Sequence, residues 1–125
     1  MNSPLLHDPT ASLPAGLLDL QALERLRALD PGGTAGLLGR VLGTYTASLA
    51  RLVEQLRQAR RSADVQAQRH VAHTLKSSSA SVGALKLSAL CADIEDRMRD
   101  DPPATDAQFD ALISEAEHLL VHLRA

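Results

Sequence analysis

The sequence predicts an all-α protein, an antiparallel four-helix bundle with a short N-terminal helix that caps it. Leucine and alanine, which are good helix formers, dominate the composition. Apolar residues recur at alternating steps of three and four positions, which is the period of an amphipathic helix. Clusters of β-branched residues and period-two alternation, the signals of a strand, are both missing. These three observations favour a helical bundle over any sheet protein.

The N-terminal part of the chain is expected to be a leader followed by one short helix. Residues 1–15 contain three prolines and no apolar period, so we expect a flexible leader and a single domain over residues 16–125. A helix is predicted at about residues 17–29, because the Asp30–Gly33 segment is a strong stop signal. This helix has more leucines than one buried stripe requires, so we expect some of them to form an exposed docking patch. These leucines are Leu17, Leu20 and Leu23.

Two long helices are predicted next. The first covers about residues 34–60, and its apolar residues lie on one stripe. That stripe is Leu38, Leu42, Tyr45, Leu49, Leu52 and Leu56. The second covers about residues 63–82, with Ser62 and Asp64 as candidate caps. Its stripe is Val65, Gln68, Ala72, Leu75, Ser79 and Val82.

The C-terminal part contains two further predicted helices. Gly83 marks a break before a helix at about residues 84–99, which ends at the proline-containing segment that follows. Its inward residues are Leu87, Leu90, Cys91, Ile94 and Met98. Thr105 is expected to cap the last helix, whose apolar residues run from Phe109 to Leu123. Four long helices with short connections and one stripe each are typical of an antiparallel bundle.

Composition and charge narrow the possible partners. A net charge of −2 without a basic run argues against binding nucleic acid or an acidic membrane surface. No stretch approaches the roughly eighteen apolar residues of a membrane span, and no secretory signal is visible, so we expect a cytoplasmic protein. The single cysteine, Cys91, excludes an internal disulfide and fits a reducing compartment. Because each apolar stripe has a partner within the bundle, we expect a monomer.

His73 is the candidate functional residue. At 100° per residue it lies about 140° from the centre of its helix's apolar stripe, on the solvent side. Arg69, Lys76, Ser77 and Ala80 lie one or two turns away on the same face. Two cations therefore accompany the imidazole, and the small side chains leave room for another protein to approach it.

This patch suits phosphoryl transfer. An ordinary imidazole, with a pKa near 6.5, is mostly neutral at pH 7 and has a ring nitrogen free to attack phosphorus. Lys76 can reach the oxygens of a transferring phosphoryl group. The chain has no glycine-rich phosphate loop and no Asp/Asn set for Mg²⁺. We therefore expect a phosphocarrier without kinase activity or a cofactor of its own, whose partner supplies the acidic pocket and the Mg²⁺.

Residues 70–84 (HVAHTLKSSSASVGA) resemble the signature of histidine-containing phosphotransfer (HPt) domains, roughly A-H-x-L-K-G-S-x-x-x-x-G-A. The resemblance covers about residues 17–124 and implies a four-helix bundle. It also implies that His73 is the phosphoacceptor, through Nε2, and that Lys76 assists the phosphate. The implied partners are response-regulator receiver domains and hybrid histidine kinases. Ser77 departs from the pattern, which usually has glycine there, and this departure bears on partner choice.

Three hypotheses about function follow. The first is a phosphorelay intermediate that carries a phosphoryl group on His73 between receiver aspartates. The second is a docking or inhibitory bundle that binds a receiver or kinase without stable phosphorylation, although such a protein needs neither the histidine nor the lysine at +3. The third is a helical metalloprotein, which is weakest because inward Glu-x-x-His motifs are missing. We expect no metal at His70 and His73, and we expect His118 and His122 to be surface residues.

Overall fold

The structure is a computed structural model that describes residues 8–99 and 104–124, and within these residues it contains helices and no strand. The elements in chain order are α1 (Leu20–Ala28), the short 3₁₀ helix η2 (Pro31–Gly33), α2 (Leu37–Arg61), α3 (Val65–Val82), α4 (Leu85–Arg97) and α5 (Asp106–Leu123). None of the helices in the described part of the chain has the length and hydrophobicity needed to cross a bilayer.

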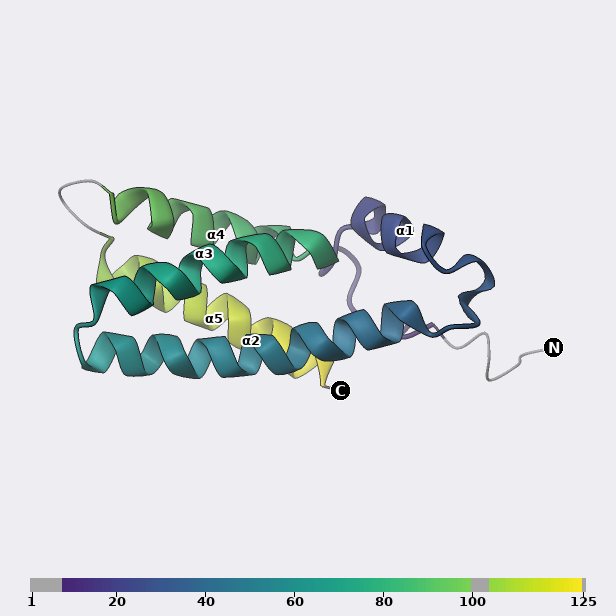
Figure 1. Cartoon of the computed structure of the whole chain (residues 1–125), viewed down its shortest axis with the longest axis horizontal. Coiled ribbons are helices and arrows are strands. Elements are labelled where there is room, and N and C mark those ends of the chain that lie inside the picture. The colour runs from purple at the N-terminus through teal and green to yellow at the C-terminus, as the bar shows by residue number, and fades with distance from the viewer. Residues whose placement is uncertain (1–7, 100–103, 125) are drawn as a thin grey trace.

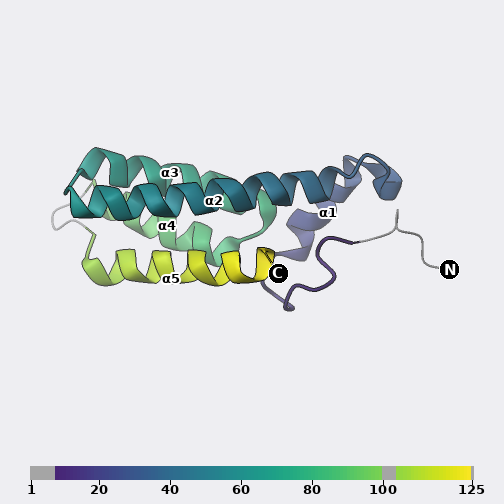
Figure 2. The same cartoon turned by 90° about the horizontal axis from the view of Figure 1, so that it is seen from below.

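Helices α2 to α5 form the bundle, as the two views in Figures 1 and 2 show. Helix α3 packs between α2 and α4, and α5 closes the bundle by packing on α4 and α2. Helix α1 contacts α2 and α3 and lies at one end of the bundle (Figure 1). The predicted fold class is confirmed.

The core consists of the predicted stripes. All six stripe residues of α2 are buried, and so are Leu87, Cys91 and Ile94 of α4. The stripe of α3 is buried except for Val65, which is exposed because it is the first residue of that helix, at the end of the bundle. Val71, which was not expected on the stripe, is buried. Leu90 and Met98 are half-buried.

Several helices begin later than predicted, for identifiable local reasons. Helix α1 begins at Leu20 because the side chain of Asp19 caps it by accepting a hydrogen bond from the Ala22 amide. Helix α2 begins at Leu37 because the residue before it, Gly36, has a φ of 65°, in the left-handed region. The capping residues predicted for α3 and α5, Asp64 and Thr105, are confirmed.

Gly83 joins α1 to the turn between α3 and α4. Its φ is 83°, a conformation that favours glycine, and it ends α3. The Asp19 amide donates a hydrogen bond of 2.8 Å to the Gly83 carbonyl. A Cβ atom added to Gly83 would lie 2.7 Å from the backbone nitrogen of Asp19. This close approach fixes where α1 meets the bundle.

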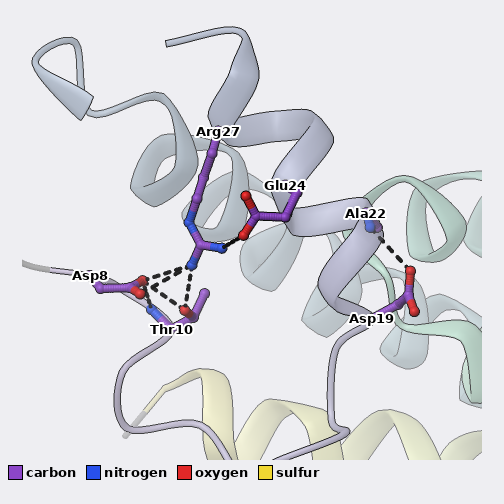
Figure 3. A network of polar contacts seen from close by, with 6 residues as sticks. All are labelled: Asp8, Thr10, Asp19, Ala22, Glu24 and Arg27. Atoms are coloured by element: carbon purple, nitrogen blue, oxygen red, sulfur yellow. Dashed lines mark hydrogen bonds and ion pairs between the residues drawn. The ribbon is translucent and has the colours of Figure 1, made fainter. Parts of the chain in front are cut away.

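The described part of the N-terminal segment is attached to α1 (Figure 3). The guanidinium of Arg27 donates to a carboxylate oxygen of Asp8 at 3.1 Å and to the Thr10 hydroxyl at 3.0 Å. It also pairs with Glu24 at 2.9 Å. Leu13 packs against the core. The predicted leader is thus held at this end, while its residues 1–7 lie outside the described residues, and its boundary with the domain stays a prediction.

Candidate functional site

Helix α3 presents His73 to solvent. Its neighbours Ala72 and Leu75 are fully buried, and this stripe orients the opposite face outward, as the sequence predicts. The helix is fixed at its start, where Asp64 caps it and the Gln68 side chain donates to the Ala59 carbonyl of α2 at 3.1 Å. The side chain of His73 is 61% exposed, so the predicted orientation is confirmed.

Helix α4 adds a carboxylate to the same place. Glu95 accepts from Nδ1 of His73 through Oε2, at 2.6 Å, and from Nζ of Lys76 through Oε1, at 2.5 Å. Each carboxylate oxygen therefore has its own partner from α3. The Glu95 side chain is only 6% exposed, whereas Lys76 is 35% exposed. The carboxylate thus lies beneath the imidazole and the ammonium group.

Glu95 is ionised at neutral pH. The ammonium of Lys76 lowers the pKa of the Glu95 carboxyl below its usual range, burial opposes this, and the ring of His73 lowers it further. Burial, followed by the charge of Glu95, raises the pKa of the neighbouring Cys91 thiol to about 12, so this thiol remains neutral. One carboxylate and one ammonium group of opposite charge therefore lie together next to the imidazole.

The charge of Glu95 decides which nitrogen of His73 is free. An ionised carboxylate can only accept hydrogen bonds, so Nδ1 of His73 must be the protonated nitrogen. In the neutral ring the other nitrogen, Nε2, then has its lone pair available and points away from Glu95. A neutral imidazole with a free Nε2 on an exposed side chain is equipped for nucleophilic attack.

Two further hydrogen bonds hold α3 against its neighbours. The Ser88 hydroxyl of α4 donates to the backbone carbonyl of Lys76 at 2.8 Å. On the opposite side, the Tyr45 hydroxyl and the Ser79 hydroxyl are 2.7 Å apart and both residues are buried. Burial raises the pKa of Tyr45 to about 12. These contacts fix the helix whose outer face bears His73.

A shallow hollow surrounds the imidazole. The residues that line it lie on α3, on α4 or just after α4. They are Gln66, Arg69, His70, His73, Glu95 and Arg99. Arg69 and Arg99 place two cations at its rim. The rim is therefore suited to an anionic group or to an acidic partner surface.

The geometry is that of a histidine carrier, and comparison with known proteins agrees with it. Residues 40–122 match the Hpt domain family, which is more than half of the chain. The chain belongs to the Hpt family. Hpt domains are phosphocarriers of two-component signalling that exchange phosphoryl groups through histidine and interact with response-regulator receivers and histidine kinases. The matched range contains His73, Lys76 and Glu95, whereas α1 lies outside it.

A solved structure supports the fold. The chain is similar to the crystal structure of histidine-containing phosphotransfer protein B (HptB) from Pseudomonas aeruginosa PAO1, with a TM-score of 0.74. The identity is 23%, and the likeness covers 89% of this chain and 94% of that chain. At this identity the comparison shows the shared Hpt fold. No curated sequence matches this chain.

The predicted docking residues of this Hpt domain lie in three different places: on the outer face of α3, at a second hollow, and, for Leu23, in the core. Arg69, Ser77 and Ala80 are exposed on the outer face of α3, and Arg69 shares the hollow of His73. Leu17 is half-buried and Leu20 is exposed, and both line a different hollow, beside Leu85 of α4 and Glu115 of α5. These residues stay predictions as docking sites.

The expectation for Leu23 is wrong. Its side chain is buried in the core together with Ala22, because these two residues form the face of α1 that packs on the bundle. A buried leucine cannot contact a receiver. Leu23 therefore attaches α1 to the bundle. Of the three leucines predicted to form the docking patch, Leu20 is the exposed one.

Sequence reasoning assigned no role to Glu95 or Arg99. A signal for Glu95 was present, because it lies four residues after Cys91 and eight after Leu87, on the buried stripe of its helix. A carboxylate on an apolar stripe requires a partner. The sequence alone does not say that the partners are His73 and Lys76, which lie 22 and 19 residues away.

Proposed function

We propose that this protein is a phosphorelay intermediate in which Nε2 of His73 accepts a phosphoryl group from a receiver aspartyl phosphate and passes it to the aspartate of another receiver. The observation that carries the proposal is the 2.6 Å hydrogen bond from Nδ1 of His73 to the buried Glu95 carboxylate. It leaves Nε2 as the free nucleophile on a side chain that is 61% exposed.

The transfer step needs no proton from solvent. The Nε2 lone pair forms a bond to phosphorus, and the bond between phosphorus and the aspartate oxygen breaks, so that its electron pair returns to the aspartate carboxylate. Nδ1 keeps its proton, and its hydrogen bond to Glu95, throughout the step. The phosphorylated ring is then a cation beside an anion, and in the return step the leaving group is a neutral imidazole. The same arrangement therefore serves acceptance and donation.

The partner is expected to complete the site. The rim cations Arg69 and Arg99 suit an acidic surface such as the one around a receiver aspartate. Ser77 and Ala80 leave room on the outer face of α3 for that surface to approach. The Mg²⁺ is expected to come with the receiver. The protein itself is expected to act in the cytoplasm as a monomer.

The test is a transfer assay with isolated domains. Each receiver of the same genome is phosphorylated with radiolabelled phosphate and mixed with the purified protein, and label on the protein is tested for stability in acid and base. We expect label that is lost in acid, retained in base and chased onto a second receiver. Binding to a receiver or a kinase without uptake of label would instead identify an inhibitory docking protein.

A further inference from the structure

Lys76 is expected from the sequence to contact the phosphoryl group, but its ammonium is bound to Glu95 at 2.5 Å. The carboxylate has one oxygen for the lysine and one for the imidazole. It is also 94% buried, since its side chain is 6% exposed. In this arrangement Lys76 acts on His73 through Glu95, the carboxylate to which both side chains are bound.

Resting on the proposed function, we propose that Lys76 acts in phosphoryl transfer as a positioning residue, by balancing the Glu95 charge so that the His73 ring stays neutral. Without this lysine, the buried carboxylate would have the imidazole as its remaining direct partner. An opposite charge at hydrogen-bond distance favours the charged form of a titratable group. A larger fraction of the rings would then carry a second proton, on Nε2, and would lack the nucleophilic lone pair.

The other charged groups around His73 do not replace Lys76. Arg69 and His70 of α3 and Arg99 beyond α4 line the hollow on its outer side, and no hydrogen bond joins them to Glu95 among the described residues. Cys91, behind Glu95, has a pKa raised to about 12 and is neutral. Lys76 is therefore the direct counter-charge of the carboxylate.

The variants separate this role from direct contact with phosphate. Lys76→Met removes the charge and keeps most of the aliphatic stem, and Lys86→Met is the matched control on the exposed face of α4. In Glu95→Gln the carboxylate charge is gone while the amide oxygen can still accept from Nδ1. The double variant Lys76→Met/Glu95→Gln has neither charge, so no unbalanced carboxylate favours protonation of the imidazole.

The first measurement is transfer from the receiver that labels the wild type, as a ratio to wild type at each pH between 6 and 9. We expect Lys76→Met to move the midpoint of the pH–rate profile upward by about one unit, which is roughly a threefold loss at pH 7 for an ordinary imidazole. The loss should disappear near pH 9. At pH 7 the double variant should be faster than Lys76→Met, and Lys86→Met should equal wild type.

A second measurement does not depend on any receiver. The ring protons of His73 are followed by NMR against pH, and the titration midpoint should rise in Lys76→Met and return in the double variant. An unchanged midpoint, or a transfer deficit that is equal at every pH and undiminished in the double variant, would overturn the inference. If no receiver labels the wild type, the proposed function fails, and the NMR result still decides the charge balance.

Discussion

A lysine, a glutamate and a histidine lie together at two places in the described part of this bundle. In the first, Glu95 is 6% exposed and binds both His73 and Lys76, at 2.6 and 2.5 Å. The carboxylate is fixed by two partners from one neighbouring helix. Because the carboxylate is buried, solvent screens these two contacts less than it screens contacts at the surface.

The second cluster has the same residue types but a different construction. Lys86 of α4, 77% exposed, pairs with Glu115 of α5 at 3.5 Å, and that glutamate is 12% exposed. His118 lies along the same hollow, and its ring packs edge-on against His122, with centroids 4.8 Å apart. An ion pair of this kind contributes little to stability. The comparison shows that a short contact between a buried carboxylate and the ring, rather than composition, distinguishes the candidate site.

The largest difference between the two clusters is expected when the histidine of each cluster is replaced. We expect His73→Gln to abolish phosphoryl uptake from a phosphorylated receiver and His118→Gln to leave it unchanged. Both side chains are exposed, so both variants should fold: His118→Gln should shift the free energy of unfolding by less than about 0.5 kcal/mol, and His73→Gln, which removes a hydrogen bond of the buried Glu95, by about 1 kcal/mol. Label uptake and thermal unfolding measure the two effects. Continued labelling of His73→Gln would exclude His73 as the acceptor and make His70 the next candidate.

A bulky side chain on the outer face of α3 should block the partner. Ser77 lies one turn after His73, so Ser77→Leu and Ser77→Arg are expected to reduce transfer at least tenfold by steric exclusion, with helicity unaltered in circular dichroism. Ser114→Leu, on the exposed face of α5 near the second cluster, is the matched control and should transfer normally. Normal transfer by the Ser77 variants would show that the receiver does not approach over this turn.

Gly83 lies beside the second cluster and should matter for stability alone. Gly83→Ala forces a left-handed conformation on alanine and places its Cβ 2.7 Å from the Asp19 nitrogen. We expect a loss of about 2 kcal/mol or more in the free energy of unfolding, measured with urea. Transfer by the folded fraction should equal that of wild type. A loss of transfer beyond the loss of folded protein would connect this turn to the site.

The pH dependence of stability should differ between the two glutamates. The pKa of Glu95 is lowered in the folded protein, chiefly by Lys76, so its ionisation stabilises the fold above the unfolded pKa of about 4.3. This contribution is lost as the pH falls through the lowered folded pKa. We expect Glu95→Gln to cost about 1–2 kcal/mol at pH 7 and progressively less in acid.

The matched control for this effect is Glu115→Gln, which breaks the longer pair, at 3.5 Å, with the exposed Lys86. It should cost less than about 0.5 kcal/mol at neutral pH. Urea unfolding of both variants and the wild type between pH 3 and pH 7 measures the difference. Equal costs for the two variants at pH 7 would mean that burial of Glu95 confers no advantage on its contacts.

The smallest expected effect concerns the departure from the HPt pattern. Ser77→Gly should keep or raise the transfer rate, because glycine opens the space that a receiver enters. It should also lower the free energy of unfolding by up to about 1 kcal/mol, since glycine is a poor residue inside a helix. Slower transfer in this variant would instead indicate that the Ser77 hydroxyl donates to the phosphoryl group.

The features that the sequence predicted correctly depend on local patterns. The stripe of α2 follows from residue spacing, and the caps Asp64 and Thr105 follow from the side chains that begin a helix. The cap of α1, Asp19, is a local signal of the same kind that was not used, whereas the place where α1 meets the bundle depends on the contact of Asp19 with Gly83, which lies far along the chain. Burial of Leu23 was missed because nothing in α1 itself shows which of its faces meets the bundle.

The candidate site was likewise predicted in part: local patterns located His73 but not its contacts with Glu95. The exposure of His73 follows from the helical period of a single segment, and its role is implied by the resemblance of that segment to HPt domains. The contacts of Glu95 require the relative register of α3 and α4, to which the Ser88 hydrogen bond to the Lys76 carbonyl contributes. A short-range pattern therefore located the nucleophile, and tertiary structure was needed to find the group that orients it.

The most direct test of the central claim is an NMR spectrum of the ¹⁵N-labelled protein after phosphorylation by its receiver. Couplings between phosphorus, nitrogen and the ring protons identify which ring nitrogen bears the phosphoryl group. We expect phosphorus on Nε2 of His73, with a proton retained on Nδ1. Phosphorus on Nδ1, or on another residue, would contradict the arrangement in which Glu95 holds one nitrogen and leaves the other free.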